Sequence, residues 1–112
     1  MSKFDEAVAK NVAEAKKCGI KVDEALLTKV AKGLGPSLYK ADAEKVAFSD
    51  KAEMDRLKAN FLGKKLGVTD EAKIDAALAE IKDQFGSANK NKLRALTYYL
   101  LVKKFKKESV YA

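Results

Sequence analysis

The sequence of 112 residues contains no histidine and only one cysteine, Cys18. Without histidine the chain has no imidazole metal ligand and no Ser-His or Cys-His pair that could activate a nucleophile. A single thiol cannot form an internal disulfide, which is typical of a reducing compartment. We interpret Cys18 as a small structural residue. These absences argue against an enzyme, and we predict no catalytic residue, no metal site and no cofactor.

Proline and glycine are also scarce, with one Pro and six Gly in the whole chain. An all-β fold with many tight turns needs more of both. The abundant residues are Ala, Lys, Leu and Glu, which are strong helix formers, and no alternation of apolar and polar residues lasts for the length of a strand. The sequence predicts an all-α protein, with residues 1–112 forming one domain and a single compact bundle of about five helices.

Long apolar runs are missing as well. The longest uncharged run in the apolar C-terminal part covers residues 95–102, whereas a membrane-spanning helix needs about 20 residues. The first six residues, MSKFDE, carry charges and lack the apolar centre of a signal peptide. We therefore expect a cytoplasmic protein that makes no contact with a membrane.

Several segments share one pattern, in which a capping residue is followed by apolar residues three and four positions apart and then by glycine. Written from the capping residue to the glycine, the expected helices are Ser2–Gly19, Asp23–Gly33, Ser49–Gly67 and Thr69–Gly86, followed by a last helix that starts at Ser87 or Asn89 and ends near Phe105. Residues 36–48 are the least regular stretch and have room for two short helical turns.

Acidic residues are almost missing from the end of the chain. Residues 1–86 hold 16 Lys and Arg against 15 Asp and Glu, a net charge of +1, whereas residues 87–112 hold seven basic residues and one acid, a net charge of +6. The same end is the most apolar part of the sequence. A helix that is apolar nearly all round is normally packed on several sides, so we predict that the last helix is buried at the centre of the bundle.

The start of this last helix departs from a rule that the other expected helices obey. They carry acidic residues in the first turn, where the helix dipole favours negative charge, but this one has Lys90, Lys92 and Arg94. Backbone N–H groups at a helix start, together with Lys and Arg side chains, form a natural anion site. We predict that these three cations bind a carboxylate, a phosphate or an acidic partner surface, with Asn89 and Asn91 as neutral donors.

The alternative is that an acidic helix of the same fold neutralises these cations, such as the face that carries Asp75, Glu80 and Asp83. Tyr39 and Lys40, on the irregular glycine-proline loop, are further candidates for partner contact, because loops without a packing role often carry contacts. The lysines at residues 103–107 need no partner to explain them, since cations are favourable at a helix C-terminus.

The net charge of +7 also raises nucleic acid as a partner. Residues 64–69 resemble the turn of a helix-turn-helix, but the helix after it holds five acids against two lysines, so a phosphate-lined groove would repel it. Non-specific polyanion binding through the basic C-terminal region, with Tyr98 or Tyr99 stacking on bases, is an alternative that we do not favour. A structural or homo-oligomerising domain is another.

Three stretches of the sequence carry a family signature. They are LLTKV at 26–30 leading into GPSLYKAD at 35–42, NFLGKKLG at 60–67, and GSANKNKLRA at 86–95 followed by YYLL at 98–101. Together they resemble a small bacterial family that is catalogued as a domain of unknown function. The resemblance implies a compact all-α protein and no activity, so it assigns no functional residues. Our leading interpretation is a non-enzymatic helical domain that docks an acidic protein partner or an anion through the start of its last helix.

Overall fold

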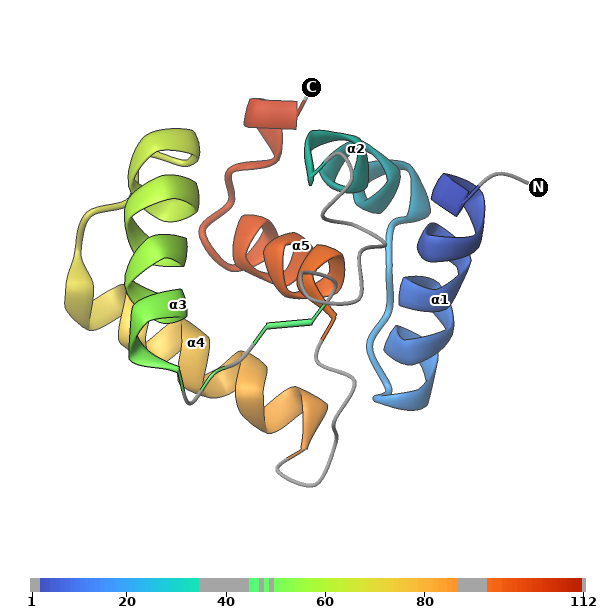
Figure 1. The fold of residues 1–112 in the computed structure, drawn as a ribbon, viewed down its shortest axis with the longest axis horizontal. Helices are drawn as coiled ribbons and strands as arrows, with labels where there is room; N and C mark the ends of the chain where they lie inside the picture. The colour runs from blue at the N-terminus through green and yellow to red at the C-terminus, as the bar shows by residue number, and fades with distance from the viewer. Residues whose placement is uncertain (1–2, 35–44, 47, 49, 87–92, 112) are drawn as a thin grey trace.

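The computed structural model describes residues 3–34, 45–46, 48, 50–86 and 93–111 (Figure 1). In chain order the elements are α1 (Lys3–Lys17), α2 (Glu24–Leu34), α3 (Lys51–Arg56), the π-helix η2 (Leu57–Lys65), α4 (Glu71–Phe85), α5 (Arg94–Lys104) and the 3₁₀ turn η3 (Glu108–Tyr111). Within these residues, β-structure is limited to one antiparallel bridge between Lys45 and Leu93. The prediction of an all-α bundle of about five helices is confirmed.

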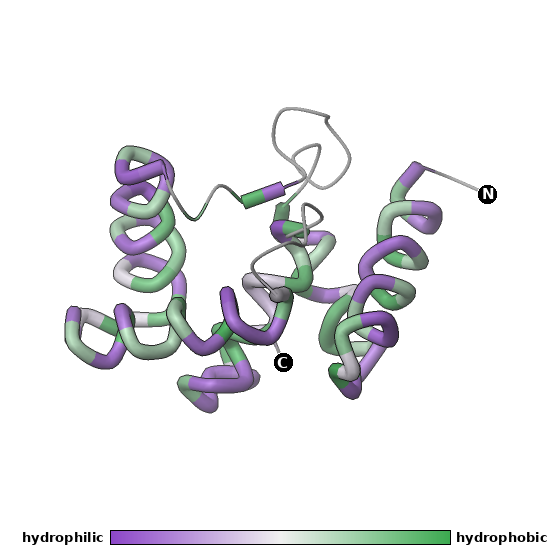
Figure 2. Tube along the Cα trace, turned by 90° about the horizontal axis from the view of Figure 1, so that it is seen from below, coloured by the Kyte–Doolittle hydropathy of each residue, from purple (hydrophilic) through white to green (hydrophobic). Residues whose placement is uncertain are grey.

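The amphipathic pattern that predicted the helices is visible along the chain trace. Figure 2 shows hydrophilic and hydrophobic residues alternating along each helix, as expected when one face packs and the other meets water. In α4 the predicted stripe of Ile74, Leu78, Ile81 and Phe85 is buried. The helix ends at Gly86, whose φ of +89° is a conformation that glycine adopts without steric cost.

Two helices begin one residue later than the sequence pattern predicts. The N-cap of α3 is Asp50 and not Ser49, and its carboxylate accepts a hydrogen bond from the Glu53 N–H at 3.3 Å. The N-cap of α4 is Asp70 and not Thr69, and it accepts from the Lys73 N–H at 3.3 Å. An aspartate satisfies the same backbone donor as a hydroxyl and adds a negative charge that the helix dipole favours.

The second half of the long helix predicted up to Gly67 is a π-helix. Its hydrogen bonds reach five residues back, as in the bond from the Leu66 N–H to the Phe61 carbonyl at 3.0 Å. Leu57, Phe61 and Leu62 are all buried. Leu57 and Phe61 are four residues apart, a spacing that an α-helix also places on one face, so the apolar pattern alone does not separate the two helix types.

The last helix, α5, lies at the centre of the described structure, as predicted (Figure 1). It contacts α1, α2 and α4, and its buried residues are Ala95, Leu96, Thr97, Tyr99, Leu100, Leu101 and Val102. The predicted start at Ser87 or Asn89 is wrong, because α5 begins at Arg94. Leu93, just before α5, has an extended backbone and pairs with Lys45 in the antiparallel bridge, so it is not part of the helix.

The N-terminus of α5 is capped by a residue from another helix. Leu93, at the N-cap position, provides no side-chain hydrogen bond. Instead the Leu96 N–H donates to Oδ1 of Asn11 in α1 at 3.0 Å, and Nδ2 of Asn11 donates to the Ala7 carbonyl at 2.8 Å. Leu96 is the third residue of α5, where a capping side chain usually accepts. Asn11 therefore ties α1 to the central helix.

We expect the Asn11→Ala variant to lose about 1–3 kcal/mol of unfolding free energy, because the Leu96 N–H would be buried without an acceptor. Asn11 itself is only 3% exposed. The measurement is equilibrium unfolding in urea. The matched control is Asn60→Ala, which removes an exposed amide from η2 and is expected to change stability by less than about 0.5 kcal/mol. Equal losses in the two variants would contradict the capping role.

Candidate functional site at the start of α5

Among the residues predicted to bind an anion or a partner, Arg94 is the one that the structure describes. The others lie outside the described residues, and their roles stay predictions: Tyr39, Lys40, Asn89, Lys90, Asn91 and Lys92. The site is therefore built here from Arg94 and from the described residues that surround the start of α5.

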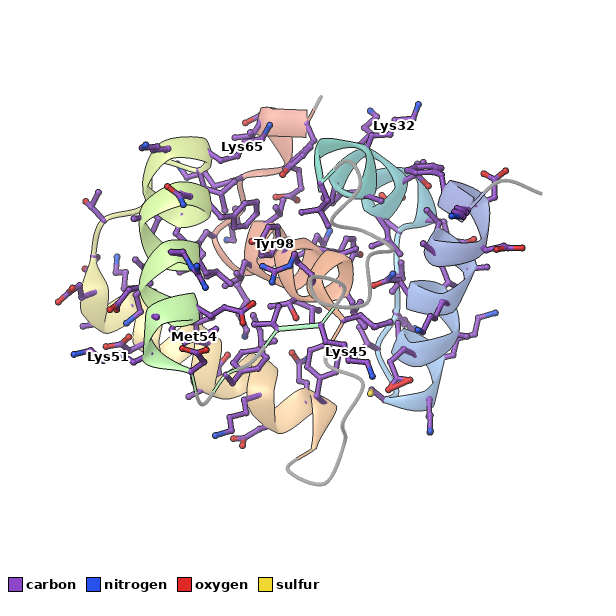
Figure 3. All side chains as sticks on the ribbon, viewed as in Figure 1. Lys32, Lys45, Lys51, Met54, Lys65 and Tyr98 are labelled. Carbon is purple, nitrogen blue, oxygen red and sulfur yellow. The ribbon has the colours of Figure 1, made fainter. Side chains whose placement is uncertain are left out.

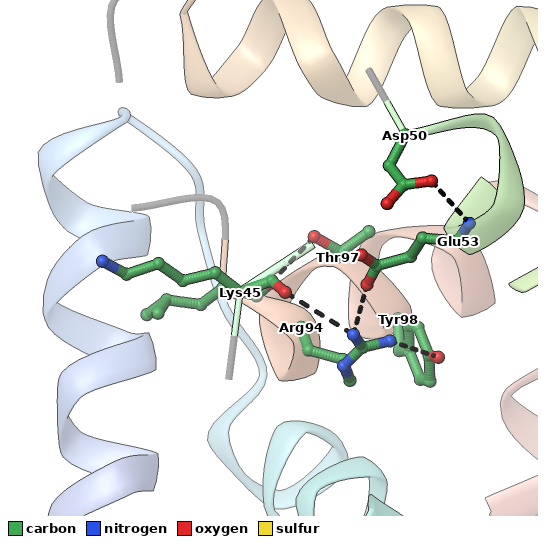
Figure 4. A network of polar contacts seen from close by, with 7 residues as sticks. Lys45, Asp50, Glu53, Arg94, Thr97 and Tyr98 are labelled. Carbon is green, nitrogen blue, oxygen red and sulfur yellow. Dashed lines mark hydrogen bonds and ion pairs between the residues drawn. The ribbon is translucent and has the colours of Figure 1, made fainter. Parts of the chain in front are cut away.

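Arg94 is the centre of a polar cluster between α5 and α3 (Figure 4). Its guanidinium forms an ion pair with the Glu53 carboxylate. It also donates to the Tyr98 hydroxyl at 3.1 Å and, through a long bond of 3.5 Å, to the Lys45 carbonyl. The side chains of Arg94 and Glu53 are each only 16% exposed. We call Arg94, Glu53, Tyr98 and the Lys45 carbonyl the Arg94 cluster.

The surroundings of Arg94 favour its charged form. Burial lowers the pKa of the guanidinium, but the hydrogen bonds and charges of Tyr98 and Glu53 raise it by more, so the pKa lies above its ordinary value. A charge that is largely removed from water is stabilised only when it is paired and hydrogen-bonded. The Arg94 cluster meets both conditions, so Arg94 holds α5 against α3.

An acid of the same fold thus pairs with Arg94, as the alternative interpretation of the sequence anticipated, but the acid is Glu53 of α3. Two of the three acids proposed for that role on α4 have other partners. Asp75 pairs with Lys58 at 2.7 Å, and Glu80 pairs with Lys104. Both α4 pairs involve a well-exposed acid, and exposed pairs contribute little to stability.

The structure adds Lys45, which sequence reasoning missed, to the start of α5. The bridge to Leu93 brings this exposed lysine next to the N-cap of the helix. In Figure 4 the Lys45 side chain extends away from the Arg94 cluster, while its carbonyl faces Arg94. A bridge of one residue pair has no periodicity, so the sequence carries no signal that could have placed Lys45 here.

The two tyrosines of α5 have the hydroxyl partners that their burial requires. Tyr99 is 2% exposed, and its hydroxyl accepts from the Asp23 N–H at 2.8 Å. Tyr98 accepts from Arg94 and stacks on Phe61, with ring centroids 4.0 Å apart. Because Tyr99 is buried, it cannot stack on a nucleic-acid base in this fold. Tyr98 is partly buried.

Two searches of the described residues bear on other kinds of site. Within them, no group of three or more His, Cys, Asp or Glu side chains is arranged to hold a metal ion. None of the described helices combines the length and the apolar character that crossing a membrane requires.

Comparison with known proteins identifies a family. The family model described as "Protein of unknown function (DUF2853)" matches residues 8–109. This match confirms the resemblance to a domain of unknown function that the three sequence stretches indicated. No curated protein matches the chain.

Proposed function

We propose that this chain, which belongs to the DUF2853 family of proteins of unknown function, is a non-enzymatic domain that docks an acidic segment of a partner protein at the start of α5. The observation that carries the proposal is the bridge between Lys45 and Leu93, which adds an exposed cation to this end of the helix. Lys90 and Lys92 come just before Leu93 in the sequence, and residues 87–107 contain no acid.

The residues of this site have different roles in the proposal. Lys45, Lys90 and Lys92 supply the charges that meet the carboxylates of the partner, with the Asn89 and Asn91 amides as further donors. Arg94 is the positioning residue. Its ion pair with Glu53 joins α5 to α3, and this holds the start of α5, next to the docking residues, in a fixed position.

The charges around the Arg94 cluster favour a short acidic protein segment over nucleic acid. Asp50, the exposed N-cap of α3, lies beside the cluster (Figure 4). A phosphate backbone presents negative charge along its whole length and would meet this carboxylate. A protein segment can place its acids opposite the lysines and a neutral residue opposite Asp50, which gives selectivity by charge.

The test compares two triple charge reversals that change the net charge equally. The site variant carries Lys45→Glu, Lys90→Glu and Lys92→Glu, and the control carries Lys17→Glu, Lys29→Glu and Lys73→Glu on α1, α2 and α4. The probe is a fluorescent 20-residue polyglutamate, and the readout is its anisotropy. We expect the site variant to bind about tenfold more weakly than the control, because each reversal replaces an attraction with a repulsion.

Two results would overturn the proposal. The first is an equal loss of polyglutamate affinity in both triple variants, because the effect would then belong to net charge and not to the site. The second is tighter binding of a 20-nucleotide single-stranded DNA than of polyglutamate, with the steep salt dependence of phosphate contacts. Far-UV circular dichroism checks that both variants keep the helical content of the parent chain.

A further inference from the structure

A second surface, separate from the lysines at the start of α5, lies where α2, η2 and η3 meet. It is a groove of about 210 Å³. The lining residues that matter here come from α2, η2, α5 and η3: Gly33, Leu34, Phe61, Lys65, Tyr98 and Tyr111. We call it the tail groove, because Tyr111 from the C-terminal turn η3 forms part of its wall.

Two contacts hold the Tyr111 ring in the tail groove. Its ring lies against the bare backbone of Gly33, where an added Cβ would be 3.6 Å from Cε1 of the ring. The Lys65 ammonium lies 4.9 Å from the ring centroid, within the range of a cation–π interaction. Burial, together with the nearby Tyr98, raises the pKa of the Tyr111 hydroxyl to about 12. The groove therefore binds an aromatic side chain and holds it partly out of water.

The segment that carries Tyr111 has only weak contacts other than those of the Tyr111 ring. Glu108 pairs with Lys103 at 3.7 Å, but both side chains are well exposed, so the pair adds little stability. Val110 is 38% exposed. Lys106, in the turn that leads to η3, has a φ of +53° and caps the C-terminus of α5, because its N–H donates to the Lys103 carbonyl at 3.2 Å and the Lys107 N–H donates to the Val102 carbonyl at 2.9 Å. The exposed ion pair and the exposed Val110 indicate that release of the segment costs little free energy.

The rim of the tail groove is basic. Lys65 lines the groove, and Lys32, which precedes Gly33 in the sequence, lies on the other side of η3 in Figure 3. Lys103 adds a third cation, already paired with the acid of the seated segment. The groove thus combines an aromatic pocket with a positive rim, and the seated segment, Glu108-Ser-Val-Tyr111, has an acid three positions before its aromatic residue.

We propose that the tail groove binds a segment of a partner protein that has an acidic residue three positions before an aromatic one, and that Glu108–Tyr111 covers the groove until such a segment displaces it. The aromatic ring of the partner takes the place of Tyr111 against Gly33 and Lys65. Its acid meets the lysines of the rim, as Glu108 meets Lys103. The seated segment acts as an internal competitor, because only molecules with a released tail can bind.

The test uses the hexapeptide Lys-Glu-Ser-Val-Tyr-Ala, which copies residues 107–112, titrated into the isotope-labelled full chain and followed by NMR. We expect Tyr111→Ala to bind the peptide about tenfold more tightly than the parent chain, which corresponds to a tail that is docked in about nine of ten molecules. Tyr111→Phe is the matched control, because it keeps the ring and should bind as weakly as the parent.

Further variants test whether the peptide binds in the tail groove. In the Tyr111→Ala background, Lys65→Glu is expected to lower the peptide affinity, and a peptide with alanine in place of its tyrosine should not bind. Equal peptide affinities in the parent chain, Tyr111→Ala and Tyr111→Phe would overturn the proposal and leave η3 a structural turn. A dimer of the parent chain that Tyr111→Ala abolishes would also overturn it, because the occupant would then be the tail of a second copy.

Discussion

Leu101→Ala is expected to lower the unfolding free energy by about 2–5 kcal/mol, the range for removing most of a buried leucine side chain. Leu101 has no exposed surface and belongs to the central helix, which contacts α1, α2 and α4. A cavity at such a position closes poorly, because movement of one helix into it would separate that helix from its other neighbours. The cost should therefore lie in the upper part of the range.

Urea unfolding followed by circular dichroism measures this loss, and Val110→Ala is the control. Val110 also loses an aliphatic side chain, but it is 38% exposed in η3, so its replacement should change stability by less than about 0.5 kcal/mol. A loss below about 1 kcal/mol in Leu101→Ala would contradict the central position of α5. The difference between the two variants separates burial from the general effect of shortening a side chain.

The burial of α5 could be predicted because it depends on composition within one segment. A run such as Leu100-Leu101-Val102 leaves a helix no polar face, so it must be covered on several sides. The ends of α4 were nearly predictable for a similar reason, since Gly86 and the acid beside Thr69 act on their own neighbours in the chain. Local signals of this kind survive in a single sequence.

The contacts at the start of α5 could not be predicted, because they join residues that are far apart in the chain. Asn11 caps Leu96 across 85 residues, and Glu53 pairs with Arg94 across 41. From the sequence alone, Asn11 is an ordinary polar residue of an amphipathic helix, and Glu53 is an acid in the first turn of its helix, where it interacts favourably with the helix dipole. Only the packing of α1 and α3 against α5 gives them their second roles.

The ion pair of Glu53 with Arg94 leads to the second large effect. We expect Glu53→Ala to cost about 2–3 kcal/mol, because it leaves the largely buried guanidinium without its carboxylate. This figure lies below the loss for a fully buried pair, since both side chains keep 16% of their surface exposed. Arg94→Met in the Glu53→Ala background should recover part of the loss, because the unpaired charge is then gone.

The matched control is the ion pair of Lys58 with Asp75, which has a distance of 2.7 Å and is more exposed than the pair of Glu53 with Arg94, with side-chain exposures of 27% and 62%. A double-mutant cycle on each pair isolates the coupling between its members. We expect about 1.5–3 kcal/mol for Glu53 with Arg94 and less than about 1 kcal/mol for Lys58 with Asp75. Equal coupling energies would show that the Arg94 cluster is an ordinary surface pair.

The same variants decide which role Arg94 has in docking. As a positioning residue, Arg94 can be replaced by methionine with a loss of stability but with polyglutamate affinity within about twofold of the parent, provided that the protein is measured well below its unfolding transition. If Arg94→Met instead binds polyglutamate about tenfold more weakly at full helical content, the guanidinium contacts the ligand. Arg94 would then join Lys90 and Lys92 as a binding residue, which is the role that the sequence predicted for it.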